Sequence, residues 1–309
     1  MDTIFKKRSS ALSGKPMKMK KPALDIALTI VNYFLLVFLV VVMLYPFWSI
    51  LVKSFMSDRD IISYPYAFFP KNLQFDGYKT IFVNKTYNFG RAFVNSVFVT
   101  LVDTAYQLAI TTMAAYALSK KTLPGRGIIF FYFIFTMYFG GGLIPYYMVI
   151  RDLNLLDSIW VLIIPHFISI FNVLVMRSFF LGIPAELEEA ARIDGAGDFK
   201  VFLVIVIPLS KAVLATIALF IAVGQWNDWY SAMLFIQEAP KRPMAYTLQV
   251  IIETCRGTNT DNPGGVGQRV IGESIQYAAI IVSTAPIILV YPFLQKHFTK
   301  GVLIGSVKG

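Results

Sequence analysis

Six long apolar stretches, separated by polar connections, dominate the hydrophobic pattern of the chain. They cover residues 25–52, 92–118, 128–150, 158–181, 209–236 and 275–294. A helix needs about 20 mainly apolar residues to cross the ~30 Å hydrocarbon core of a bilayer. Helices are the expected spanning form, because the stretches lack the alternating pattern of a membrane barrel. The pattern therefore predicts an all-α, polytopic membrane protein with six transmembrane helices.

Composition supports this class. The chain is 56% hydrophobic and only 15% charged, whereas soluble domains are about 45–50% apolar and about 25% charged. The surplus apolar surface must face lipid. The net charge of +10 would also suit a nucleic-acid partner. The basic residues, however, lie in short clusters between apolar runs and form no continuous basic face, so no nucleic-acid partner is expected.

The basic residues also predict the orientation of the chain, because cytoplasmic loops of membrane proteins are enriched in Lys and Arg. With the basic N-tail 1–24 inside, residues 119–127, 182–208 and the tail 295–309 are also cytoplasmic, and these regions hold most of the Lys and Arg. We expect a multi-pass protein of the cell (inner, cytoplasmic) membrane, with both termini cytoplasmic and one domain spanning residues 25–294. A cleaved signal peptide is the alternative for the first run, but that run is too long, contains Pro46 and has no small-residue cleavage site.

Enzyme chemistry is not expected. The single cysteine, Cys255, excludes an intrachain disulfide, and the histidines His166 and His297 have no metal-ligand spacing. No nucleophile–base pair or phosphate-binding loop is visible, so no catalytic residue and no metal site is assigned. A membrane-embedded enzyme would need a polar catalytic cluster, and a receptor would need a cytoplasmic output domain. The sequence offers neither.

The most polar stretch outside the N-tail lies between the fourth and fifth apolar runs. It reads PAELEEAARIDGAGDF from Pro184 to Phe199. Pro184 suits the first turn of a helix, the glutamates favour a helix N-terminus, and Gly195 permits a backbone break. A second apolar run follows from Phe199 and ends at Pro208. The stretch therefore predicts a short helix, a bend and a second short helix, with small residues where another protein's backbone can approach closely.

This spacing resembles the coupling-loop signature, or EAA motif, of ABC importer permeases. Glu189-Ala190-Ala191 is followed after three residues by Gly195, and then by Ile205 and Ile207-Pro208, where Ile207 replaces the usual Leu. Further motifs resemble the maltose-type sugar permeases: Asn95-Ser96-Val97, Ala115-Tyr116-Ala117, Pro124-Gly125-Arg126, Trp226-Asn227-Asp228, and an ending with Lys300-Gly301 and Val307-Lys308-Gly309. The triplet Gly140-Gly141-Gly142, with the long second outside loop, resembles the subgroup that serves oligosaccharides of plant or bacterial polysaccharides.

The resemblance implies a type I importer fold and a set of partners. A second homologous permease, usually forming a heterodimer in the sugar branch, would complete the channel. Two cytoplasmic ATPase subunits would hold ATP and Mg, so this chain itself would hold no cofactor, and an extracytoplasmic binding protein would deliver the solute. The loop residues implied to couple to the ATPase are Glu189, Ala190, Ala191, Asp194, Gly195 and Ala196. A merely solvated connector is the alternative interpretation of this loop.

The expected function is therefore passage of a carbohydrate, most specifically an oligosaccharide, into the cytoplasm. Alternatives are a permease for amino acids or peptides, or a membrane receptor. Candidate pathway residues are the polar and aromatic side chains Asn172, Gln225, Trp226, Asn227 and Trp229. Polar groups in a bilayer usually face a cavity or a partner, and the tryptophans could stack on a sugar ring. Alternatively, the tryptophans belong to the interfacial belt and the polar groups bridge helices.

Four further features carry expectations. Asp103 and His166 are interpreted as structural hydrogen-bonding groups, and the glycine triplet is expected to interrupt the third helix. Residues 246–255 have apolar side chains at near-helical spacing, which predicts a short amphipathic helix on the outer side. The C-terminal tail keeps several apolar residues, although a free tail should be polar. The resemblance suggests that the tail contacts the ATPase subunits through Gly301, Val302, Gly305 and Lys308. The inner lipid surface is the alternative.

Overall fold

The computed structural model describes residues 23–83, 88–257 and 272–306. The chain divides into two compact units, residues 1–49 and 50–309. Within the described part of the first unit lies most of α2 (Ala23–Lys53), which matches the first predicted span. The described residues form helices and connecting turns without any strand, which confirms the all-α class. The predicted N-tail, residues 1–22 in particular, lies outside the described residues.

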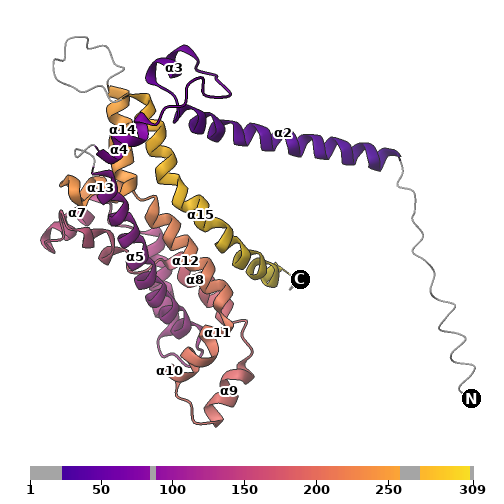
Figure 1. The fold of residues 1–309 in the computed structure, drawn as a ribbon. Coiled ribbons are helices and arrows are strands. Elements are labelled where there is room, and N and C mark those ends of the chain that lie inside the picture. Colours follow the sequence, from indigo (N-terminus) through magenta and orange to yellow (C-terminus); the bar gives the residue numbers. More distant parts are fainter. Residues whose placement is uncertain (1–22, 84–87, 258–271, 307–309) are drawn as a thin grey trace, which may run out of the picture. The chain divides into compact units, whose positions relative to one another are not determined.

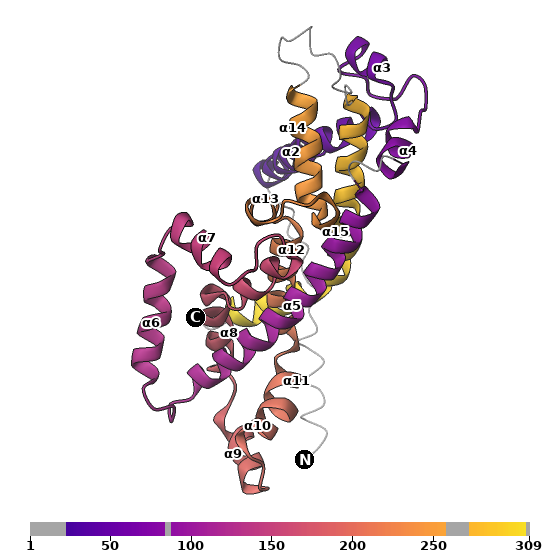
Figure 2. The same cartoon turned by 90° about the vertical axis from the view of Figure 1, so that its left-hand side faces the viewer.

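The second unit is built around α5 (Phe89–Ser119). This helix packs against α8 (Ile170–Phe180) and α12 (Lys211–Trp226), and α15 (Glu273–Ser306) packs against α12, α4 (Asp76–Val83) and α14 (Met244–Gly257). The other elements are α3 (Asp58–Ser63), α6 (Arg126–Tyr138), α7 (Leu143–Asp152), α9 (Ala185–Ile193), α10 (Asp198–Val201), α11 (Ile207–Leu209), α13 (Tyr230–Phe235), and the short η1 (Ile159–Leu162), η2 (Ile164–His166), η3 (Phe202–Val206) and η4 (Ala239–Lys241). Figures 1 and 2 show α9 and α10 at one end of this unit, and α4 and α14 at the other.

Buried apolar side chains form separate clusters along this unit. Toward α9 and α10, side chains such as Tyr116, Met176 and Ile217 join α5, α8 and α12. Farther along α5, a second cluster, which we call the junction cluster, joins α5, α7, η1 and α13 through Val99, Ile150, Val161, Leu162, Ile163, Ala232, Phe235 and Ile236. A third cluster joins α4, α14 and α15 with Phe89 at the start of α5. Because α5 contributes to all three, it is the element that holds the unit together.

The described helices match most of the predicted spans by length and composition, but the pair that includes α12 begins at residue 198, inside the predicted loop 182–208. Ala27–Lys53, Phe89–Ser119 and Glu273–Val290 are each long and apolar enough to cross a membrane. Three pairs of shorter helices meet the same test when each bent pair counts as one span: α6 with α7, η1 and η2 with α8, and residues 198–209 with α12. The described part of the chain therefore allows three to six crossings, the upper value being the predicted one.

The third predicted span is interrupted where the glycine triplet lies, as expected. α6 ends at Tyr138, α7 begins at Leu143, and the two helix axes differ by 111°. Gly142 has a φ of +85°, a backbone conformation that side chains with a Cβ rarely adopt. The glycines thus permit a sharp elbow inside an otherwise apolar run.

The fifth predicted span, residues 209–236, is wrong as a continuous helix. α12 ends at Trp226, and α13 begins only at Tyr230. The Asn227 Nδ2 donates to the Val223 carbonyl at 2.8 Å, and the Asp228 Oδ1 accepts from the Ser231 N–H at 3.1 Å. Short polar side chains compete in this way with the backbone pattern of a helix. They end one helix and begin the next.

The helix that contains the sixth predicted span is longer than that span. α15 continues beyond residue 294 to Ser306. Most residues just after 294 are acceptable in a helix, and the chain has no proline after Pro292 to stop it. Gly301, Val302 and Gly305 are therefore part of α15, whereas Lys308 lies outside the described residues.

The amphipathic helix predicted over residues 246–255 is confirmed as α14. It buries Met244, Ile251 and Cys255 against α4 and α15. Burial raises the pKa of the Cys255 thiol to about 11. The thiol therefore stays protonated at neutral pH and is a packing group.

A first prediction concerns Gly77, where α4 meets the start of α15. A Cβ on Gly77 would lie 2.8 Å from the carbonyl oxygen of Ser274, which is backbone and cannot rotate away. We expect Gly77→Ala to separate the two helices and to lower stability by about 1–3 kcal/mol, measured by thermal unfolding in detergent. Gly90→Ala is the control, since a Cβ there meets nothing within 4 Å. Equal melting temperatures for the two variants would contradict this account.

Candidate functional site

The polar loop between the fourth and fifth spans forms the helix, bend and second helix that the sequence predicts. α9 begins directly after Pro184, with Glu186 and Glu188 in its first turn. Negative side chains at this end are favourable, because the N-terminus of a helix carries a partial positive charge. The helix ends at Ile193, two residues before the predicted break at Gly195.

Backbone hydrogen bonds define the bend. The N–H of Gly195 donates to the carbonyl of Arg192 at 3.0 Å, and the N–H of Ala196 donates to the carbonyl of Ala191 at 2.9 Å. This pair of bonds is the Schellman ending of a helix, which requires a left-handed residue that is usually glycine. Gly195 has the required φ of +79°. An ion pair at 2.7 Å between Arg192 and Asp198 spans the bend. Its shape is therefore specified by the sequence.

The second helix extends one residue farther than predicted. It consists of α10, the wider π-helical turn η3 and α11, and it passes Pro208 to end at Leu209. Proline lacks an N–H and its ring crowds the carbonyl four residues earlier. A widened turn directly before Pro208 is compatible with both properties, so the proline does not end the helix. The chain then turns by 83° at Ser210 into α12.

The loop is attached to the end of α5 by one lysine. Lys120 forms an ion pair with Glu188 of α9, and its ammonium lies 4.1 Å from the centre of the Tyr116 ring. The Tyr116 ring is in turn 4.9 Å from the Phe202 ring of η3. Both arms of the loop are thus held by α5. The two segments that the sequence places in the cytoplasm, 119–127 and 182–208, lie at the same end of the unit.

This loop exposes several small or apolar side chains, although its sequence is highly polar. Of the predicted coupling residues, Glu189, Ala190, Asp194 and Gly195 are exposed, whereas Ala191 and Ala196 are half-buried. Two large apolar side chains next to them are exposed: Ile193 at 87% and Phe199 at 69%. Exposed apolar groups rimmed by charges are typical of a protein–protein contact.

A second prediction tests the attachment of this loop. The Lys120 and Glu188 side chains retain only 22% and 15% of their exposure, so reversing either charge leaves a poorly solvated charge unpaired. We expect Lys120→Glu or Glu188→Lys alone to lower stability by about 2–4 kcal/mol, and the double reversal to recover part of it. A thermal-unfolding double-mutant cycle measures the coupling. Arg192→Ala, at an exposed pair, should cost under about 1 kcal/mol. Additive effects of the two reversals would show that the pair is unimportant.

The candidate pathway residues do not form one site. Gln225 and Trp226 end α12, Asn227 and Trp229 lie in the break after it, and Asn172 is buried in the first turn of α8. Among the described residues no hydrogen bond joins Asn172 to the other four. The amide of Asn227 is used within its own helix. Trp229 is 37% exposed.

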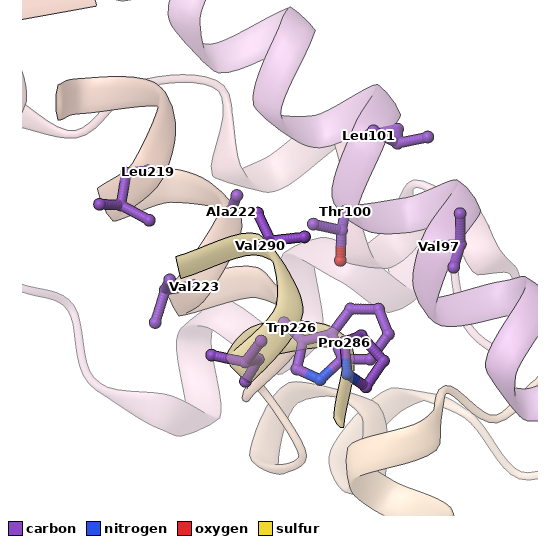
Figure 3. A pocket seen from close by; sticks show the side chains of 10 residues that line it. Val97, Thr100, Leu101, Leu219, Ala222, Val223, Trp226, Pro286 and Val290 are labelled. Carbon is purple, nitrogen blue, oxygen red and sulfur yellow. The ribbon is translucent and has the colours of Figure 1, made fainter. Parts of the chain in front are cut away.

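Trp226 has a structural partner. Its indole N–H donates to the Ser283 carbonyl of α15 at 3.2 Å, and its ring meets the Phe93 ring edge-on at 6.1 Å. It also lines a cavity of about 260 Å³ between α5, α12 and α15 (Figure 3). The other lining side chains are Val97, Thr100, Leu101, Leu219, Ala222, Val223, Pro286, Ile287 and Val290. Such an apolar wall does not suit a hydroxyl-rich sugar, so Trp226 is best described as bridging helices here.

Asp103 and His166 are structural hydrogen-bonding groups, as the sequence suggests. Asp103 is buried in α5 and its Oδ2 accepts from the Gln107 side chain at 2.9 Å. The Nδ1 of His166 lies 3.1 Å from the Leu162 carbonyl.

Sequence reasoning missed a set of contacts at the opposite end of the unit from α9, which we call the outer clamp. It fixes residues 237–242, between α13 and α14. The Asp157 Oδ1 accepts the backbone N–H groups of Gln237 and Glu238, both at 3.0 Å. The Lys241 ammonium lies 3.1 Å from the Asp157 Oδ2. From α5, the Asn95 amide donates to the carbonyls of Pro240 at 2.8 Å and of Arg242 at 3.1 Å.

Comparison with known proteins agrees with the fold. The chain is 43% identical over 266 residues to protein LplC of Bacillus subtilis, covering 85% of this chain and 89% of that protein. It is 40% identical to the polygalacturonan/rhamnogalacturonan transport system permease protein YtcP of Bacillus subtilis, covering 89% and 96%. A crystal structure of a bacterial ABC transporter involved in the import of the acidic polysaccharide alginate superposes with a TM-score of 0.80 at 32% identity, covering 91% of this chain and all of that one. No family model matches the chain.

These likenesses, together with the apolar helices, define a membrane-spanning subunit of an ATP-driven importer, which is a transport component and not an enzyme. More narrowly, the chain belongs to the carbohydrate-uptake permeases of ABC importers. The family expected from the loop and the sugar-permease motifs is thereby confirmed.

Proposed function

We propose that this chain carries an acidic, uronate-containing oligosaccharide. This substrate class is supported by the names of two proteins that the chain resembles. One relative is a permease for polygalacturonan and rhamnogalacturonan, and the superposing structure belongs to an importer of the acidic polysaccharide alginate. Galacturonan and alginate are both polymers of uronic acids, whose sugar rings each carry a carboxylate.

The proposed assembly contains a second homologous permease, two ATPase subunits that hold ATP and Mg, and an extracytoplasmic binding protein. The exposed surface of Glu189, Ala190, Asp194 and Gly195, with Ala191 and Ala196 behind it, would dock on an ATPase subunit. Its small side chains and the neighbouring exposed Ile193 favour a close protein contact. The C-terminal end, with Gly301, Val302, Gly305 and Lys308, would form a second contact with the ATPase pair.

The proposed topology has the N-tail 1–24, the loop 182–208 and the C-terminal end in the cytoplasm, with residues 25–294 as the transmembrane domain. Two observations support the alternation of sides. Lys120 meets Glu188, which joins two segments assigned to the inside. Asp157 meets residues 237 and 238, which joins two segments assigned to the outside.

The function can be tested by reconstituting the permease pair with its ATPase subunits in liposomes and adding the binding protein. We expect ATP-dependent accumulation of galacturonate or related uronate oligosaccharides. Their carboxyl-reduced, neutral counterparts should compete weakly. Accumulation of neutral oligosaccharides with no uptake of uronate-containing ones would refute the acidic substrate class and leave the carbohydrate permease assignment in place.

A further inference from the structure

The outer clamp presents one cationic side chain without a counter-ion. Two adjacent residues of the clamp are basic, Lys241 and Arg242. Lys241 has two carboxylate partners, Asp157 and Glu238, each at 3.1 Å. Arg242 takes part in none of the ion pairs in the described part of the chain. Lys241 and Arg242 thus differ in their ion pairing, although both extend from the same short segment that the clamp holds.

Arg242 is held in place by neutral groups. Its Nη2 donates to the Gln237 carbonyl at 2.8 Å, and its guanidinium carbon lies 5.0 Å from the centre of the Tyr246 ring. Its Nε is buried and has no hydrogen-bond partner among the described residues. A guanidinium is always charged in proteins. A partly desolvated charge with an unused donor is unfavourable unless an anion completes it.

The backbone and the side chain of Arg242 are both held by neighbouring residues. Its carbonyl accepts from Asn95 of α5, and the preceding residue is tied to Asp157. Tyr246, over which it lies, packs against the junction cluster, where α5, α7, η1 and α13 meet. Arg242 therefore stands on a rigid support beside the ends of interrupted helices, on the side assigned to the outside. A preorganised arginine of this kind binds carboxylates well, because two of its N–H groups match the two oxygens.

We propose that Arg242 binds a carboxylate of the incoming oligosaccharide and so contributes to selection of uronate-containing substrates. The proposal rests on the proposed function, which supplies the acidic sugar. The Nη2 bond to Gln237 holds the guanidinium plane, and the sugar carboxylate supplies the counter-ion that the described residues do not. A lysine at this position would offer one point charge on a flexible stem in place of the planar fork.

The test uses the complete importer in liposomes with its binding protein and a galacturonate oligosaccharide. We expect Arg242→Gln to lower the initial import rate at sub-saturating substrate by at least about tenfold, and Arg242→Lys to be intermediate. Arg91→Gln is the matched control, because Arg91 is an exposed arginine at the start of α5 outside the clamp; it should import at the wild-type rate. Lys241→Gln distinguishes loss of a substrate-binding charge from loss of stability. It loosens the clamp and should lower the melting temperature, whereas Arg242→Gln should not.

Three outcomes would overturn the proposal. The first is import of the acidic oligosaccharide by Arg242→Gln as fast as by the wild type. The second is a loss of affinity of Arg242→Gln for the sugar-free binding protein in parallel with import, measured on the same preparation, which would place a carboxylate of the binding protein on Arg242. The third is a melting temperature of Arg242→Gln as low as that of Lys241→Gln, which would make the role structural. If the wild-type importer takes up no uronate oligosaccharide at all, the proposed function itself fails, and that result is distinct from the other three.

Discussion

Replacing Gly195 with proline is expected to leave the permease inserted in the membrane and to abolish import. Gly195 has a φ of +79°, and its N–H closes the Schellman ending of α9. Proline is fixed near a φ of −65° and has no N–H, so it excludes both features. The bend must open and the exposed face of α9 must turn. If that face docks on the ATPase, binding-protein-stimulated ATP hydrolysis should fall to its unstimulated level.

A graded series at the same position separates geometry from side-chain size. Gly195→Asn should retain most of the stimulation, because asparagine tolerates the left-handed conformation, and Gly195→Ala should fall between asparagine and proline. The measurements are retention of the ATPase subunits during purification and stimulated hydrolysis in liposomes. Wild-type values for the proline variant in both assays would show that this loop does not couple the two subunits.

Replacing Asp157 with alanine is expected to have the largest effect on stability at the outer end, about 3–4 kcal/mol. The carboxylate accepts two backbone N–H groups and pairs with Lys241, and each of the two hydrogen bonds contributes about 1 kcal/mol at a site that water reaches. The residue also has a φ of +53°, which alanine adopts at a cost of about 1–2 kcal/mol.

Asp157→Asn is the matched control for this variant. Asparagine keeps an oxygen acceptor and tolerates the positive φ, so it should lose only the ion pair and cost about 1 kcal/mol. Thermal unfolding in detergent measures both variants. Equal losses for alanine and asparagine would assign the whole effect to the charge of Asp157 and none to its backbone partners.

The Asp157 carboxylate also makes the stability of the outer clamp sensitive to acid. The Glu238 backbone N–H, together with Lys241 and the Gln237 N–H, lowers the pKa of Asp157 to about 2, from an ordinary value of about 4. A lowered pKa contributes stability that is complete above the unfolded-state pKa and is lost as the pH falls through the folded-state pKa. Between about pH 4 and pH 2, the wild-type melting temperature should therefore fall more than that of Asp157→Asn. Parallel curves would contradict this assignment.

The sequence predicts those parts of the fold that are determined by residues close to each other along the chain. Apolar run length predicts α2, α5 and the membrane part of α15, and Gly195 predicts the bend after α9 because its missing Cβ is a local property. The end of α12 was missed for the opposite reason. The hydropathy of residues 209–236 favours a continuous helix, and the structure ends it through side-chain hydrogen bonds of Asn227 and Asp228.

The outer clamp could not be predicted, since its partners are distant in sequence. In the sequence, Asn95 stands out only as part of a family motif, whereas its bond to the Pro240 carbonyl joins residues 145 positions apart. Asp157 stands in a short connection, where an aspartate looks like any solvated loop residue. Likewise, nothing in a list of basic residues distinguishes Arg242 from Lys241 until their partners are known.

The helix α5 is attached at both ends, so it can transmit a displacement from one end to the other. Asn95, near the start of the helix, is bonded to the segment carrying Lys241 and Arg242, and Tyr116 and Lys120, at its other end, contact the two arms of the α9–α10 loop. A continuous helix of 31 residues is about 46 Å long and resists compression. A displacement of the α9–α10 loop along the axis of α5 would therefore reach the segment that carries Lys241 and Arg242 without being absorbed by the helix.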